Sequence, residues 1–214
     1  MNDHSKGLLI TLIGVLFVVP DSIMVRLISS DPMVTAFWRS STAGTFVAIF
    51  VLLTMRDDVM KTITQMGRAG WTYCVLIGTT SPAFVLAVQN TSVANVVLIF
   101  ASMPVFSAIL GFLFLSERPS RKLLMTSCFV FVGLAIIGLG SSGGATAHWI
   151  GDLWAVYIVI AFSTALTLLR RQKHISMLPA IPIGYIGAAC VMFWFIEPFE
   201  TLATDGALYL LHGV

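Results

Sequence analysis

Two ionisable side chains, Asp21 and Arg39, fall well inside long apolar runs of the sequence. Asp21 precedes the end of one run by seven residues, and Arg39 follows the start of the next run by seven residues. At about 1.5 Å of rise per helical residue, both side chains would lie about 10 Å below the same membrane surface and could face each other. Because a charge inside hydrocarbon costs roughly 2.5–3.5 kcal/mol on insertion scales, each is a candidate functional residue.

The Asp21 and Arg39 pair has two interpretations, and the sequence leaves both open. In the first, the pair is structural and holds two neighbouring helices together. In the second, it lines a cavity, where Arg39 attracts an anionic or carboxylate group and Asp21 takes up a coupling proton.

Further polar candidates lie near the same two runs and the two that follow. Trp38 adjoins Arg39, while Gln89 and Asn95 add amide groups near the ends of two other apolar runs. Pro104 falls at the centre of a run and cannot donate a hydrogen bond to the carbonyl four residues earlier. Interfacial anchoring, hydrogen bonds between helices and a simple kink are the structural alternatives. The candidate substrate-binding set is Asp21, Trp38, Arg39, Gln89, Asn95 and Pro104.

The sequence lacks the motifs of several kinds of catalysis. Cys74, Cys128 and Cys190 occur singly inside apolar runs, without the paired spacing of a zinc site or a redox motif. Neither HExxH nor GxSxG occurs, and no GxxxxGK[ST] loop is present to bind ATP. We therefore expect no cofactor, no metal and no enzymatic activity, so any energy coupling would come from a proton, another ion or the solute gradient.

The elements that would position the candidates are membrane-spanning helices. Apolar residues make up 57% of the chain and charged residues only 10%, whereas soluble domains carry about 25% charged residues. A helix needs about 20 apolar residues to cross the hydrocarbon core. The sequence predicts an all-α polytopic bundle with about seven spans, at 7–28, 32–55, 69–88, 93–115, 123–140, 151–169 and 179–196.

The charges alternate between the gaps. Most lysines and arginines fall in every second gap, and the other gaps carry mainly acidic residues. Because basic loops stay in the cytoplasm, the pattern predicts a cytoplasmic N-terminus. This explains the net charge of +2 without a nucleic-acid partner. Glu117 adjoins a basic gap, where a solvated network of salt bridges is the favoured interpretation.

A weak internal repeat divides the chain. Aligning Gly7 with Gly151 also aligns Arg26 with Arg170, and a flexible Ser/Gly stretch at 141–145 separates the two parts. We expect a first five-helix unit at 7–140, a linker at 141–150 and a partial second unit at 151–214. Because five is odd, the second unit would be inverted in the membrane, as in many secondary transporters. Two whole units would make ten spans, so we expect the chain to be incomplete.

Three segments carry a family resemblance. Residues 91–95 open a helix with small residues, Pro104 lies in its middle, and Phe114–Ser120 closes it with a Glu-Arg pair. Together with the glycines between Gly133 and Gly140, these segments resemble the EamA-type drug/metabolite transporters. The resemblance covers 7–140 well and 151–214 loosely. Thr126 stands where the family often has glycine.

The resemblance implies a ten-helix secondary transporter of small metabolites or drugs, usually an exporter, in a bacterial inner membrane. Its partners would be a small solute, the bilayer and a coupling proton or ion. Association of two copies stays open. The alternatives are a non-transporting fragment or assembly protein and, less favoured, a membrane-embedded enzyme acting on lipids.

Overall fold

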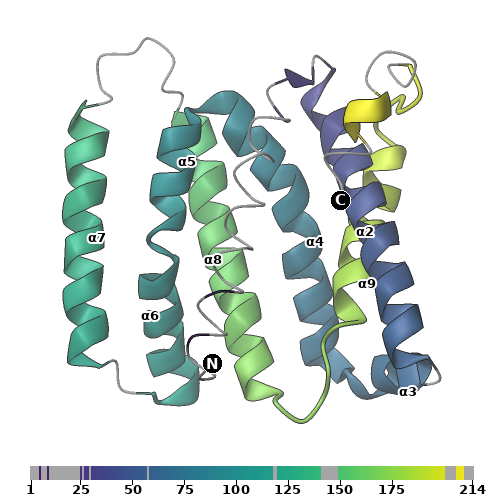
Figure 1. Cartoon of the computed structure of the whole chain (residues 1–214), viewed down its shortest axis with the longest axis horizontal. Coiled ribbons are helices and arrows are strands. Elements are labelled where there is room, and N and C mark those ends of the chain that lie inside the picture. The colour runs from purple at the N-terminus through teal and green to yellow at the C-terminus, as the bar shows by residue number, and fades with distance from the viewer. Residues whose placement is uncertain are drawn as a thin grey trace.

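The computed structural model is a bundle of helices placed side by side, with connections at both ends (Figure 1). It describes residues 30–56, 58–117, 120–140, 149–200 and 206–209, together with Ser5, Leu9, Val25, Leu27 and Ile28. At 134–135 and 137–140 it describes the backbone but not the side chains. Asp21 and most of the predicted span 7–28 lie outside the described residues. The described helices are α2 (Pro32–Met55), α3 (Asp58–Gln65), α4 (Gly67–Asn90), α5 (Val93–Phe100), α6 (Met103–Leu115), α7 (Arg121–Gly140), α8 (Trp149–Arg171) and α9 (Ala180–Phe193).

The predicted fold class is confirmed. Among the described residues, four segments are long and apolar enough to span a membrane, namely Pro32–Met55, Gly67–Asn90, Val93–Leu115 and Trp149–Arg171. The predicted span 123–140 lies within α7, which has 20 residues, and 179–196 contains the shorter α9, which has 14. The short helix α3, in the gap between α2 and α4, was not predicted.

Side chains cap the helices where the sequence changes from polar to apolar. The Asp31 carboxylate accepts a hydrogen bond from the Met33 amide at 2.7 Å, and proline follows at the first helical position. Ser92 accepts from the Asn95 amide at 3.1 Å and begins α5. Ser120 accepts from the Leu123 amide at 3.2 Å, just before α7. Each cap satisfies an amide that has no partner within the helix.

Helix α4 is the centre of the bundle. It packs against α8 on one side and against α2 and α9 on the other, and it is the most buried of the four candidate spans. Helices α5 and α6 pack against α8, whereas α7 contacts only α5 and α6 appreciably and lies at one edge (Figure 1). Helix α8 therefore separates α4 from α6.

Small residues bring α4 and α9 into backbone contact. A Cβ added to Gly78 would collide with the Gly184 carbonyl, and a Cβ added to Gly184 would collide with the Cys74 carbonyl. Such close approach is a common way for membrane helices to gain van der Waals contact, because lipid supplies no hydrophobic driving force between them. The α4–α9 distance is thus set by two glycines.

The ends of the bundle differ in charge. Every described lysine and arginine except Arg39 lies at the end where α4 begins and α8 ends, drawn at the bottom of Figure 1. Asp31, Asp152, Glu197 and Glu200 lie at the opposite end. We call these the basic end and the acidic end. The alternation read from the sequence therefore corresponds to a real separation in space.

Candidate functional site

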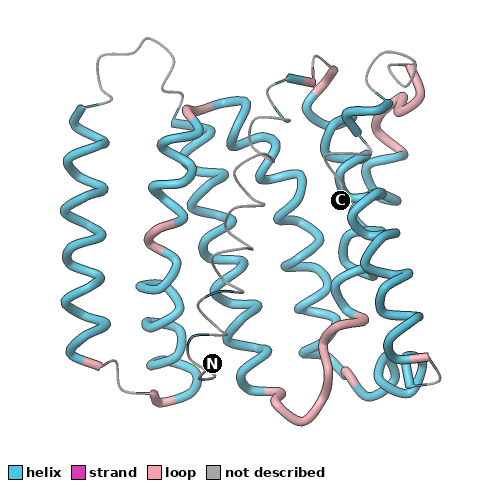
Figure 2. Tube along the Cα trace, viewed as in Figure 1, coloured by secondary structure: helices cyan, strands magenta, loops and turns pink. Residues whose placement is uncertain are grey.

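The fourth predicted span is broken in its middle. The sequence predicts one helix over 93–115, but α5 ends at Phe100 and α6 begins at Met103, as the loop between them in Figure 2 shows. Pro104 has no N–H to give to the carbonyl of Phe100. The Ser102 hydroxyl donates instead to the Ile99 carbonyl at 2.5 Å. The predicted span 93–115 is confirmed as one segment long enough to cross a membrane, Val93–Leu115, and its helix is interrupted next to Pro104.

The break lies against the start of the second predicted unit. Both α5 and α6 pack on α8, and the Ser163 hydroxyl of α8 donates to the Met103 carbonyl at 3.3 Å. Ser163 is fully buried, as are nearly all of Ser102 and Thr167. Hydroxyl groups therefore satisfy part of the irregular backbone, as a broken helix inside a membrane requires.

Arg39 reaches from α2 into the middle third of α4. Its Nη1 donates to the Ser81 hydroxyl at 3.1 Å, and its guanidinium carbon lies 4.9 Å from the centre of the Phe84 ring. Ser40 also donates to Ser81, at 2.8 Å, and both serines are buried. The guanidinium is therefore held by a hydroxyl and an aromatic face at mid-depth, both from α4.

An aromatic contact connects the Arg39 region to the broken span. The Phe84 ring lies 6.2 Å from the ring of Phe100, the last residue of α5. Val96 of α5 belongs to the same buried cluster as Phe84. The guanidinium and the break thus border one shared apolar core, although they come from helices far apart in the sequence.

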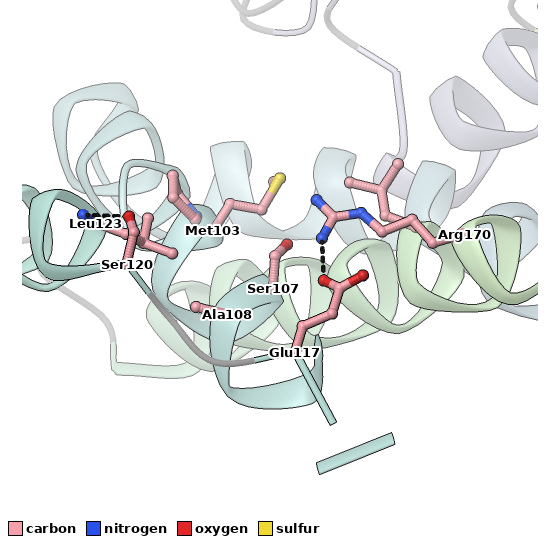
Figure 3. A pocket seen from close by; sticks show the side chains of 9 residues that line it. Met103, Ser107, Ala108, Glu117, Ser120, Leu123 and Arg170 are labelled. Atoms are coloured by element: carbon pink, nitrogen blue, oxygen red, sulfur yellow. Dashed lines mark hydrogen bonds and ion pairs between the residues drawn. The ribbon is translucent and has the colours of Figure 1, made fainter. Parts of the chain in front are cut away.

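A groove of about 390 Å³ runs from the break toward the basic end. It is lined by residues of α6, the start of α7 and α8, including Met103, Pro104, Ser107 and Leu166 (Figure 3). An ion pair closes its basic end, where Arg170 Nη1 lies 3.5 Å from Glu117 Oε2. Both side chains are about half exposed.

The end of α6 is shaped to present Glu117. Ser116 adopts a left-handed conformation with φ of 56°, which ends the helix, and the Glu117 amide donates back to the Gly111 carbonyl at 3.2 Å. A Cβ on Gly111 would lie 3.3 Å from Glu117 Oε2, so glycine leaves room for the carboxylate. The partner expected from the sequence was a neighbouring basic gap, but the described partner is Arg170, which comes from the second predicted unit.

Trp38 points away from the Arg39 contacts. Its indole N–H donates to the Pro198 carbonyl at 2.8 Å, and its ring stacks on Tyr209 at 5.6 Å with an interplanar angle of 15°. Phe199 adds an edge contact at 6.0 Å. Trp38 therefore holds the segment after α9 against the start of α2. Adjacent residues on one helix point in directions about 100° apart, which adjacency in sequence does not reveal.

Gln89 and Asn95 lie at the acidic end, away from the groove. Gln89 is exposed, and the Asn95 side-chain amide donates to the Thr91 hydroxyl at 3.3 Å. Gly151 of α8 packs on this corner, since an added Cβ would lie 2.6 Å from the Thr91 amide nitrogen. One side-chain oxygen of Asn95 and one of Asp152 are buried without a hydrogen-bond partner. The five described candidates from the sequence are thus not one constellation, and the sixth, Asp21, lies outside the described residues.

Sequence reasoning missed the residues that hold Arg39 and those that satisfy the break. Ser81, Ser102 and Ser163 are single serines in apolar runs, and the only available signal was that each is a hydroxyl within a span. Among the described residues, no group of three or more histidines, cysteines, aspartates or glutamates could hold a metal ion.

Comparison with known proteins agrees with the architecture. The model of the EamA-like transporter family matches residues 5–139. The uncharacterized transporter YyaM of Bacillus subtilis is 26% identical, over 77% of this chain and 64% of its own length. An uncharacterized transporter of Helicobacter pylori is 24% identical, over 79% of this chain and 57% of its own length.

The chain thus spans less than two thirds of the length of both curated relatives. No solved structure matches it. The family match covers more than half of the chain, and the apolar helices described above are those of a multi-pass integral membrane protein. The chain belongs to the EamA-like transporter family.

Proposed function

We propose that this protein is a secondary transporter of a small organic solute that carries an anionic group. The solute would bind near Arg39 and the broken fourth span, and it would move between the first and second five-helix units, at 7–140 and 151–214. The single observation that carries this proposal is the break between α5 and α6, packed against α8. Discontinuous helices at the interface between inverted repeats are where many secondary transporters bind their solutes.

The charges support an anionic group on the solute. Arg39 is the one described lysine or arginine outside the basic end, and its guanidinium reaches mid-depth through the contacts with Ser81 and Phe84. A guanidinium offers five N–H donors in a planar arrangement. Carboxylates and phosphates match its planar donor geometry. Asp21 would carry the coupling proton.

Alternating access would use the groove toward the basic end. In the described conformation, Glu117 of the first unit and Arg170 of the second unit tie that end together. Separation of these two side chains would open the groove between α6 and α8, and a different contact would then have to close the acidic end. We propose that the basic end faces the cytoplasm, with the N-terminus on the same side in a bacterial inner membrane, and that transport is export.

The experiment is uptake into proteoliposomes that contain the purified protein. A panel of labelled small carboxylic acids is tested, each beside its uncharged amide, with a pH gradient imposed in either direction. We expect at least one acid to accumulate above its amide and above empty liposomes. Arg39→Gln abolishes this uptake, whereas Arg171→Gln, at the exposed end of α8, retains it.

Two results would count against the proposal. Equal uptake of acids and amides in the wild-type protein would remove Arg39 as the anion-binding group, and no uptake of any solute would favour a non-transporting membrane protein. Asp21→Asn tests the coupling separately. If its uptake keeps the wild-type dependence on the pH gradient, Asp21 does not carry the proton.

A further inference from the structure

A second recess lies at the basic end, on the other side of α8 from the groove. Its volume is about 470 Å³, and it is bounded by the end of α8, the connection from Gln172 to Pro179, the start of α9 and Tyr73 of α4. Arg170 and Lys173 line it, and none of the described acidic side chains does. Arg170 also lines the groove, where Glu117 pairs with it, so Lys173 supplies the main positive charge of the recess.

The walls of this recess combine apolar and polar groups. Leu169, Ile175, Met177, Leu178 and Ile181 supply apolar surface, and Leu178 is 43% exposed. Gln172 and Ser176 add hydrogen-bonding groups beside Lys173. A ligand that suits these walls carries both a negative charge and hydrocarbon.

Tyr73 adds a hydroxyl group to the walls of the recess. The residue is only 7% exposed, and its hydroxyl takes part in none of the hydrogen bonds formed by the described residues. The hydroxyl oxygen is not among the described buried oxygens that lack a partner, so it is accessible at the recess and can donate to a ligand there. Tyr73 lies six residues after Gly67, the first residue of α4, which is about 9 Å along the helix axis from the basic end.

We propose that this recess binds the headgroup of an anionic phospholipid from the leaflet at the basic end. Lys173 would contact the phosphate as a point charge, Tyr73 would donate to a phosphate or glycerol oxygen, and the apolar wall would hold the upper part of an acyl chain. Basic pockets between membrane helices bind anionic headgroups in this way. Helix α8 lies between this site and the groove of the proposed solute path, and Arg170 borders both.

The test measures lipid binding to the purified protein in detergent by native mass spectrometry. Phosphatidylglycerol and phosphatidylcholine are titrated separately onto the wild-type protein and onto Lys173→Gln, Tyr73→Phe and Lys61→Gln. Lys61 is the matched control, since it is an exposed lysine on α3 at the same end and does not line the recess.

We expect the wild-type protein to prefer phosphatidylglycerol. Lys173→Gln should weaken that binding about fivefold, which corresponds to about 1 kcal/mol per cation near a membrane surface, and Lys61→Gln should leave it within twofold. Tyr73→Phe should weaken it as well, with phosphatidylcholine binding unchanged.

Three outcomes would overturn the proposal. Equal loss in Lys173→Gln and Lys61→Gln would mean that the basic end attracts anionic lipid diffusely. Equal binding of the two lipids to the wild-type protein would remove the charge recognition. Displacement of phosphatidylglycerol by about 10 mM inorganic phosphate, a concentration suited to weak, millimolar binding, would mean that the recess binds the free anion instead.

Discussion

Replacing Ser81 by alanine tests how Arg39 is held inside the bundle. The substitution removes the hydroxyl that accepts from Arg39 at 3.1 Å and from Ser40 at 2.8 Å. A hydrogen bond to a charged group contributes about 1.5–3 kcal/mol, and hydroxyl bonds between membrane helices average about 0.6 kcal/mol. With the Arg39 bond at the low end of its range, we expect Ser81→Ala to lower the free energy of unfolding by about 2 kcal/mol.

The control is Ser41→Ala, the same substitution one residue after Ser40. Ser41 is partly buried and lines a groove between α2 and α9, and none of the hydrogen bonds of the described residues involves its hydroxyl. We expect a change below about 0.5 kcal/mol there. Unfolding is followed in mixed micelles by titration with a denaturing detergent, using the fluorescence of the tryptophans.

A double substitution separates the two hydrogen bonds of Ser81. Ser40→Ala should cost about 0.6 kcal/mol in the wild-type protein and close to nothing once Ser81 is alanine. If Ser81→Ala and Ser41→Ala lower the stability equally, Ser81 does not hold Arg39 and the reasoning fails. In the proteoliposome assay, Ser81→Ala should also weaken uptake of the acid, because Arg39 loses the group that orients it.

Three further predictions concern other contacts. Gly78→Leu should destabilise the protein by about 1–3 kcal/mol in the same unfolding assay, because its side chain would meet the α9 backbone, whereas Gly187→Leu has open space and should be near neutral. Trp38→Phe loses the 2.8 Å hydrogen bond to the Pro198 carbonyl and should speed amide hydrogen exchange in the segment that follows α9. An unchanged exchange rate would show that ring stacking alone holds this segment in place. Glu117→Gln should change the free energy of unfolding by less than about 1 kcal/mol, since both side chains of the ion pair are about half exposed. It should, however, raise the rate at which a thiol reagent labels a cysteine introduced at Ser107, which lines the groove. An equal labelling rate would argue against closure of the groove by the ion pair.

The agreement between sequence and structure is best where a property depends on a single segment. Helix α2 begins at Pro32 after the Asp31 cap and ends at Met55, as the run 32–55 predicted. Hydrophobic length and capping are local, so they can be read without knowledge of neighbours. Helices α4 and α8 were also predicted, although each extends two residues beyond its predicted run at both ends.

The agreement is poorer for the candidate site. Trp38 and Arg39 were grouped because they are adjacent, yet one contacts Tyr209 and the other contacts Ser81. Glu117 was assigned to neighbouring cations, but its described partner is Arg170. Which side chains meet depends on how helices rotate and pack, and apolar runs with little amphipathicity carry almost no information about rotation.

The sequence by itself determined the class of the protein, the places where most helices begin and end, and the separation of charge between the two ends of the bundle. These follow from hydrophobic length, capping chemistry and the cost of charge in hydrocarbon, all of which act along one segment. Only the tertiary structure decided that α8 packs against the broken span, that Ser81 holds Arg39 and that Arg170 lines both the groove and the recess. Those features depend on contacts between segments far apart in the chain, and small residues such as Gly78 and Gly184 permit the close packing on which they rest.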